Sequence, residues 1–120
     1  MNKLTPLLLA ALLSLPAAAA DDPLEDGRQL YEFYCSICHG LTADGWGINA
    51  PYMKVQPSVL TAEGEMNTRT DEELVKVIKE GGKGVSKSAL MPRFGDNLSD
   101  PQINTLVAYI RSLCCATGNE

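Results

Sequence analysis

The sequence predicts a small all-α protein with one domain. Three segments combine helix start signals with apolar side chains at helical spacing, and no segment alternates apolar and polar residues as a half-buried strand would. After the first twenty residues about a hundred remain, which is near the lower limit at which side chains alone form a comfortable core. We therefore expect an additional component to complete that core.

Residues 1–20 have the pattern of a secretory signal peptide. Lys3 supplies a basic start, residues 7–15 are almost wholly apolar, and three alanines precede Asp21. The apolar run is too short to cross the roughly 30 Å hydrocarbon core of a bilayer, which takes about twenty residues. An uncleaved anchor is the less favoured alternative. We expect cleavage after residue 20, a mature domain over residues 21–120, and no membrane insertion after cleavage.

The charge of the chain argues against nucleic acid as a partner. The formal net charge is −5, and removal of Lys3 leaves nine basic against fifteen acidic residues, or −6. Binding to phosphate backbones requires basic stripes, which an acidic chain of this kind lacks. In an oxidising exported compartment the four cysteines would ordinarily be read as disulfides.

The first helix is predicted to begin at Asp22, with Pro23 at the first helical position and Glu25 completing a capping box. It leads directly into Cys35. Its apolar positions keep helical spacing on the same side as a glycine. These positions are Leu24, Gly27, Leu30, Tyr31, Tyr34 and Cys38.

Two further helices have equally clear start signals. Thr70 and Glu73 form a capping box for the second helix, which Gly81-Gly82 is expected to end. Ser99 and Gln102 start the third. The second helix presents Leu74, Val77 and Ile78 on one face, and the third presents Ile103, Leu106, Val107, Ile110 and Cys114.

Residues 40–67 form the connection between the first two predicted helices. They include four glycines and two prolines and keep no sustained period. A loop of this length is unusual in a compact domain unless it wraps something.

Cys35-Ser36-Ile37-Cys38-His39 is the motif that carries chemistry. Two thiols three positions apart on one helical turn can both add to the vinyl groups of a haem, and the adjacent histidine is then carried to the iron. This spacing is the c-type haem attachment motif. It answers the need for an additional core component.

Three alternatives for the two cysteines are weaker. A thioredoxin-like pair would lie at the start of a helix in a chain with βαβ patterning. A zinc site would need a second pair of ligands, and the chain has no other histidine. A disulfide across three residues closes a small loop and contributes little.

A methionine is expected as the second axial ligand of the iron. Iron held by histidine needs such a ligand to pass electrons without binding small molecules, and a thioether is the usual soft partner. Met91 is favoured because Pro92 stiffens the backbone directly after it. Met53, beside proline and tyrosine, is interpreted as core packing, and Met66, between polar neighbours, as exposed. Met53 and an open sixth position remain alternatives.

With these motifs the chain resembles class I cytochrome c over residues 21–113. Gly27, Tyr31 and the Cys-x-x-Cys-His motif match the family's first helix, and residues 106–110 resemble its last. The resemblance implies the class I cytochrome c fold, in which three main helices wrap around one covalent haem c. In that fold the first and last helices cross almost perpendicularly.

The resemblance also implies roles for individual residues. Cys35 and Cys38 would form the thioethers to haem. The axial ligands would be His39 and Met91, the latter in a segment like the methionine motif of small bacterial members. The carbonyl of Pro51 would accept the Nδ1 proton of His39. The apolar wall is expected from Met53, Leu74, Val77, Ile78, Phe94 and Leu98.

The function implied is that of a single-haem periplasmic electron carrier of bacteria, not an enzyme, which shuttles one electron between redox enzymes. Its partners would be redox proteins that dock at the exposed haem edge, near a basic stretch. The alternatives are a dedicated electron-transfer subunit of one dehydrogenase or reductase, a haem-based sensor with an open sixth position, and a thiol oxidoreductase. The basic stretch consists of Lys76, Lys79, Lys83, Lys87 and Arg93.

Cys114 and Cys115 have no standard role in the family that the chain resembles. Cys114 continues the apolar stripe of the third helix and is interpreted as a small buried side chain, with Cys115 pointing outward. We expect a monomer. The alternatives are a dimer linked by a disulfide through Cys115 and a disulfide between the two neighbours.

Overall fold

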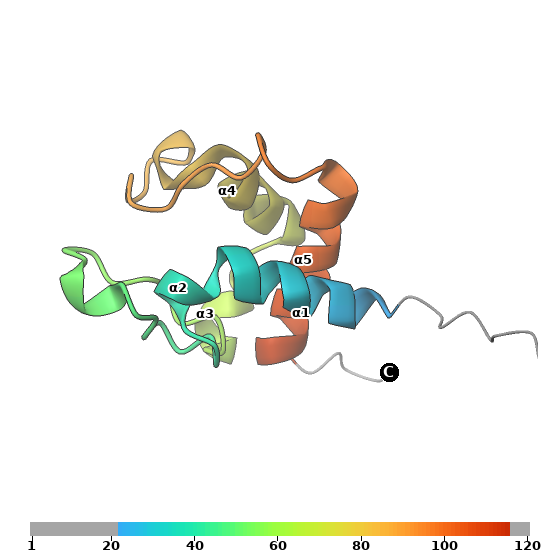
Figure 1. The fold of residues 1–120 in the computed structure, drawn as a ribbon, viewed down its shortest axis with the longest axis horizontal. Coiled ribbons are helices and arrows are strands. Elements are labelled where there is room, and N and C mark those ends of the chain that lie inside the picture. Colours follow the sequence, from blue (N-terminus) through green and yellow to red (C-terminus); the bar gives the residue numbers. More distant parts are fainter. Residues whose placement is uncertain (1–21, 116–120) are drawn as a thin grey trace, which may run out of the picture.

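The structure, a computed structural model, describes residues 22–115, and in this part of the chain it contains helices and loops but no strand (Figure 1). The all-α prediction is confirmed. The predicted signal peptide lies outside the described residues. Among residues 22–115, no helix is both long and apolar enough to cross a membrane. The elements are α1 (Pro23–Tyr34), α2 (Ser36–His39), η1 (Ala50–Tyr52), α3 (Glu63–Met66), α4 (Asp71–Gly84) and α5 (Asp100–Cys114).

Helix α1 begins where it was predicted, but its cap differs. Asp22 Oδ1 accepts a hydrogen bond from the backbone N–H of Leu24 at 3.0 Å. The predicted capping box with Glu25 is wrong, because that carboxylate instead accepts hydrogen bonds from Arg28 and Gln29, one turn further along the helix. Two side-chain donors on the same face outcompete the single backbone N–H.

Both predicted capping boxes of the later helices are present. Thr70 Oγ1 accepts from the N–H of Glu73 at 3.2 Å, and Glu73 accepts from the N–H of Thr70 at 2.9 Å. Ser99 and Gln102 make the same reciprocal pair at the start of α5. The predicted stripe of α5 faces the core, where Ile103, Leu106, Val107 and Ile110 are buried.

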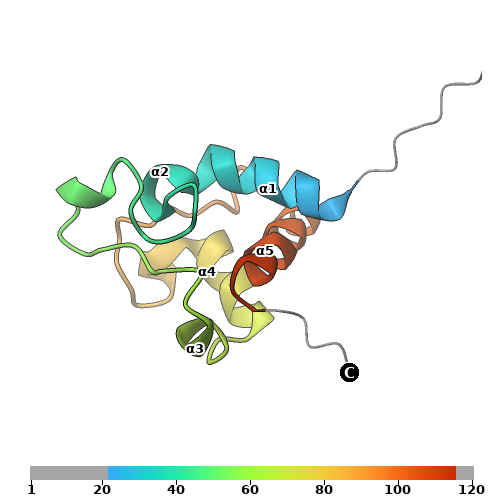
Figure 2. The same cartoon turned by 90° about the horizontal axis from the view of Figure 1, so that it is seen from below.

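Helices α1 and α5 form the main packing contact of the fold, and α5 crosses α1 steeply rather than running alongside it (Figure 1, Figure 2). Gly27 lies at the crossing, where a Cβ would be 2.5 Å from the Cβ of Tyr109 and 2.7 Å from the carbonyl oxygen of Thr105. Tyr31 is fully buried beside it, with its ring centroid 5.6 Å from that of Tyr109. The absence of a side chain at Gly27 therefore sets how closely the two helices approach.

We expect Gly27→Ala to destabilise the folded protein by roughly 1–3 kcal/mol, because the added methyl group must push the two helices apart. Urea unfolding of the haem-loaded protein, followed by circular dichroism, measures this effect. Gly64→Ala is the matched control, since a Cβ at Gly64 meets nothing within 4 Å. Equal unfolding midpoints for the two variants would show that the crossing tolerates a side chain.

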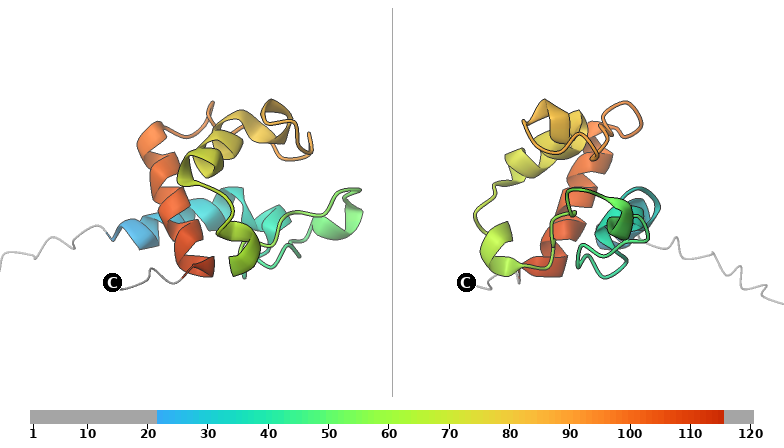
Figure 3. Two further views of the ribbon diagram at one scale, coloured as in Figure 1. Left: turned by 180° about the vertical axis from the view of Figure 1, so that it is seen from behind. Right: turned by 90° about the vertical axis from the view of Figure 1, so that its left-hand side faces the viewer.

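The connection between α2 and α4 contains only the short elements η1 and α3, so its largely irregular character is confirmed. It runs from α2 out to η1, back past α3 near the C-terminal end of α5, and on to α4 (Figure 3). Arg111 of α5 holds this connection against α5. It donates hydrogen bonds to the carbonyl oxygen of Met66 at 2.9 Å and to the carboxylate of Asp71 at 2.7 Å. The connection and α4 thereby enclose a cavity beside α2.

Candidate haem site

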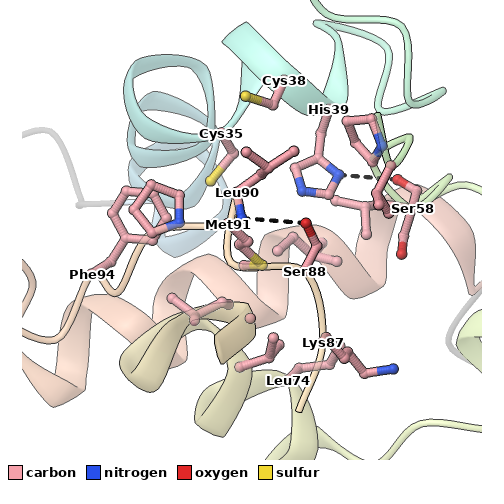
Figure 4. A pocket seen from close by; sticks show the side chains of 18 of the residues that line it. Cys35, Cys38, His39, Ser58, Leu74, Lys87, Ser88, Leu90, Met91 and Phe94 are labelled. Atoms are coloured by element: carbon pink, nitrogen blue, oxygen red, sulfur yellow. Dashed lines mark hydrogen bonds between the residues drawn. The ribbon is translucent and has the colours of Figure 1, made fainter. Parts of the chain in front are cut away.

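A cavity of about 310 Å³ lies between α2, the segment 53–60, α4 and the segment 87–94. This volume falls at the lower end of the range for small-molecule and cofactor sites. The lining is mostly apolar. It includes Cys35, Cys38, His39 and Met91, which the sequence had singled out, and Figure 4 shows these four side chains with their neighbours.

Cys35 and Cys38 reach the cavity from the junction of α1 and α2. The N–H of His39 donates to the carbonyl oxygen of Cys35 at 2.9 Å, which keeps the three residues on one helical turn. Neither cysteine is in a disulfide. Burial, with a smaller effect from Cys38, raises the pKa of Cys35 to about 12. A thiol oxidoreductase requires the opposite, a lowered pKa that yields a thiolate, so the site does not support that alternative.

His39 points into the cavity with one ring nitrogen already engaged. Its Nδ1 lies 3.0 Å from the carbonyl oxygen of Ser58 (Figure 4). Because a carbonyl can only accept, Nδ1 carries the proton and Nε2 keeps a free lone pair. Burial lowers the pKa of His39, and the bond to Ser58 opposes this only in part. The imidazole is therefore neutral at pH 7, as a metal ligand must be.

The prediction that Pro51 accepts this proton is wrong, because Ser58 takes that place. Pro51 is exposed within η1. The chain after His39 first folds back on α2, with Asn49 N–H donating to the carbonyl oxygen of Ile37, and η1 then points outward. Only the returning segment passes the imidazole. No short-range sequence signal identified Ser58 for this contact, because it lies 19 positions from His39.

Met91 enters the cavity from the segment after α4, whereas His39 enters from α2 (Figure 4). Met53 also lines the cavity, but it follows η1 on the connection that carries Ser58. The interpretation of Met66 as exposed is wrong, since it is 1% exposed and lines the cavity as well. The polar residues on either side of Met66 in the sequence suggested exposure, but α3 directs the Met66 side chain into the cavity.

Five of the six residues predicted for the apolar wall line the cavity. Leu98 does not; it is buried in the core instead. Two basic side chains, Arg69 and Lys87, also line the cavity, and no acidic side chain does. Neither residue had been assigned to the cavity wall from the sequence, because a basic residue in a polar stretch does not indicate that its side chain lines a cavity. The five wall residues are Met53, Leu74, Val77, Ile78 and Phe94.

Cys114 and Cys115 form a disulfide with each other at the end of α5, which was one of the alternatives. Both side chains are half-buried, so Cys115 does not point freely outward. With its sulfur in this bond, Cys115 offers no thiol for the dimer considered above. The structure therefore does not support a dimer linked through Cys115.

The residues around the cavity fit haem c. Two unpaired thiols and a neutral imidazole come from one helical turn, a thioether comes from a separate segment, and the walls are apolar. These are the donors that covalent attachment and axial ligation of haem require.

Comparison with known proteins identifies the family of the chain. The family model described as cytochrome c oxidase, cbb3-type, subunit III matches residues 22–110. The chain belongs to this family. It is a small single-haem c-type cytochrome of class I, and its cofactor is covalently attached haem c, the cofactor of the family's cytochrome domains. Electron transfer is the activity that this family membership indicates.

The chain is also similar to two longer proteins and to one solved structure. It is 33% identical over 109 residues to the cbb3-type cytochrome c oxidase subunit CcoP of Azospirillum sp. (strain B510), covering 85% of this chain and 33% of that protein. It is 26% identical over 97 residues to the quinohemoprotein alcohol dehydrogenase ADH IIB of Pseudomonas putida, covering 81% of this chain and 12% of that protein. The chain thus spans a third or less of either relative. The KustC0563 c-type cytochrome, 21% identical, superposes with a TM-score of 0.61 over 74% of this chain and 98% of its own, which confirms the fold.

Proposed function

We propose that the protein is a single-haem electron carrier of the bacterial periplasm, with thioether bonds from Cys35 and Cys38 and axial ligation by His39 and Met91. The supporting observation is the convergence of these four side chains on one cavity. Their arrangement on two separate segments suits a cofactor held from more than one side. We expect no catalytic turnover by this chain alone.

Haem c, when bound, supplies a reversible one-electron change between Fe(III) and Fe(II). The chain's own residues prepare the site for it. The carbonyl of Ser58 holds the Nδ1 proton of His39, which fixes the orientation of the ring and strengthens Nε2 as a donor. The apolar side chains of α4 exclude water and disfavour added positive charge, which favours the reduced state.

Absorption spectra of the purified protein, oxidised and reduced, combined with haem staining after denaturing electrophoresis, test this assignment. We expect a c-type spectrum and a stain that survives denaturation. Mass spectrometry of the same preparation should place the mature N-terminus at Asp21. A colourless protein, or pigment lost on acidic organic extraction, would refute the assignment.

A second candidate is a dedicated electron-transfer subunit of one respiratory enzyme. It is favoured by the two longer relatives, which are named as an oxidase subunit and a dehydrogenase. Affinity purification from the native membrane and periplasm separates the candidates. A stoichiometric enzyme partner would favour the subunit, whereas recovery of the cytochrome alone favours the free carrier. A sensor with an open sixth position predicts immediate carbon monoxide binding by the reduced protein.

Lys83 is exposed at the end of α4 and Lys87 is exposed on the segment that leads to Met91, in a chain that is acidic overall. We expect Lys83→Gln with Lys87→Gln to slow oxidation of the reduced protein by ferricyanide about tenfold at low salt, because steering of an anion weakens. Oxidation by a cationic cobalt(III) complex should accelerate, and both effects should vanish at high salt. Stopped-flow absorbance measures these rates.

The control lowers the net charge by the same amount elsewhere, by adding two negative charges. Asn104→Glu with Ala108→Glu also lowers the net charge by two, on the exposed face of α5. If both double variants change the ferricyanide rate equally, only the net charge matters and the basic stretch has no steering role.

A further inference from the structure

The helical path of α4 breaks at two adjacent buried glycines, Gly81 and Gly82, which contact the segment carrying Met91. Gly81, with φ 73° and ψ 171°, breaks the helical path before a final turn to Gly84. The N–H of Gly82 donates to the carbonyl oxygen of Met91 at 3.0 Å, and the carbonyl oxygen of Gly82 accepts from the N–H of Lys87 at 2.7 Å. Gly82 thus bonds the segment on both sides of Ser88.

The same segment also satisfies two carbonyls of α4 that precede the break at Gly81. The carbonyl oxygen of Ile78 accepts from the N–H of Phe94 at 2.9 Å, and that of Lys79 accepts from the N–H of Gly95 at 3.1 Å. Helix ends leave such carbonyls without intrahelical partners. The backbone around Met91 is therefore held to α4 by hydrogen bonds before and after the methionine.

This arrangement leaves no room for a side chain at either glycine. A Cβ at Gly82 would overlap the carbonyl oxygen of Ser88. A Cβ at Gly81 would lie 2.8 Å from the backbone nitrogen of Arg93 and 2.9 Å from the carbonyl oxygen of Met91. Gly81 also has the positive φ that other residues rarely adopt. All of these neighbours are backbone atoms, so relief requires the segment itself to move.

We propose that Gly81 and Gly82 are positioning residues that hold Met91 at the cavity, and that any side chain there displaces its sulfur. The inference rests on the proposed function, in which Met91 is the second axial ligand. Overpacking of this kind shifts the balance between the held and displaced segment by about 5- to 150-fold. The glycines act through the backbone and contact no reacting atom.

The test uses Gly82→Ala in the haem-loaded protein, with Gly64→Ala as the control. We expect the reduced Gly82→Ala protein to bind carbon monoxide at least about fivefold faster than wild type. We also expect its reduction potential to fall, and the weak long-wavelength band of thioether-ligated ferric haem to lose intensity. Gly64→Ala should match the wild type in all three, since its Cβ meets nothing within 4 Å.

Combining Gly82→Ala with Met91→Ala separates positioning from general stability. If the glycine acts through Met91, Gly82→Ala has no further effect on carbon monoxide binding or potential once Met91 is absent. A glycine that only stabilises the fold would lower the unfolding midpoint but leave the single variant's potential and carbon monoxide binding unchanged, and this result overturns the proposal.

A measurement on the wild-type protein covers the case in which Gly82→Ala does not fold. Imidazole added in excess competes with Met91, and hydrogen exchange then reports on the segment. We expect the amides of Gly82, Phe94 and Gly95 to exchange faster with imidazole bound; unchanged exchange overturns the positioning role. Wild-type protein that binds carbon monoxide at once refutes Met91 ligation itself, and with it this inference. Carbon monoxide resistance in both wild type and Gly82→Ala refutes the inference alone.

Discussion

Replacing both Cys35 and Cys38 with alanine is expected to abolish covalent haem and leave the chain largely unfolded. Both thiols line the cavity, and neither is in a disulfide. No other cysteine lines the cavity, so the double variant has no thiol there to which haem c could be attached. Helix α4 and the segment 53–60 both present side chains to that cavity. Without haem these side chains lose the body against which they pack.

The size of the cavity indicates how large the effect is. At about 24 cal/mol per Å³, an empty cavity of about 310 Å³ costs at most about 7 kcal/mol, and less if water enters. Domains of this kind have total stabilities of roughly 5–15 kcal/mol. A single loss of this size is therefore comparable to the whole stability of the fold.

Circular dichroism and haem staining of the double variant measure the outcome. The matched control is Cys114→Ala with Cys115→Ala, which also removes two sulfurs but at the far end of α5. We expect this control to keep both haem and helicity, because a disulfide between neighbours closes almost no loop and adds little stability. Native helicity in Cys35→Ala with Cys38→Ala would show that the core is complete without haem.

The elements that the sequence predicted well are those set by local interactions. Thr70 with Glu73 and Ser99 with Gln102 cap their helices as predicted, since each box involves residues three positions apart. Glu25 is the capping residue that was predicted wrongly. Its carboxylate had a backbone donor and two side-chain donors within reach, and local sequence does not rank such competing partners.

The parts of the site that the sequence missed depend on how a long loop returns. The Ser58 carbonyl reaches His39 across 19 positions, and nothing within a few residues of either marks the contact. Met66 is buried where α3 is held near α5. Arg111, 45 positions later in the chain, donates a hydrogen bond to the carbonyl oxygen of Met66. The sequence could single out four residues that line one cavity because cofactor chemistry restricts residue type and spacing more tightly than packing does.

Met91→Ala should convert the iron to a site that binds small molecules, while leaving haem covalently attached. We expect the reduced variant to bind carbon monoxide without a preceding slow step. Its reduction potential should fall by on the order of 0.1 V, a modest part of the roughly 0.8 V that axial ligands span, because a soft thioether favours ferrous iron. Stopped-flow absorbance and a redox titration measure the two effects.

The other cavity methionines provide the decisive controls. Met53→Leu and Met66→Leu remove a sulfur from the same cavity but keep most of the apolar volume, so packing changes little. Met66 and Met53 both lie on the connection before α4, whereas Met91 lies on the segment tied to the end of α4. We expect both leucine variants to resist carbon monoxide and keep the wild-type potential. If the reduced Met53→Leu protein binds carbon monoxide and the reduced Met91→Ala protein does not, the thioether ligand is Met53. The hydrogen bonds of Gly82 would then hold a residue of the cavity wall rather than an axial ligand.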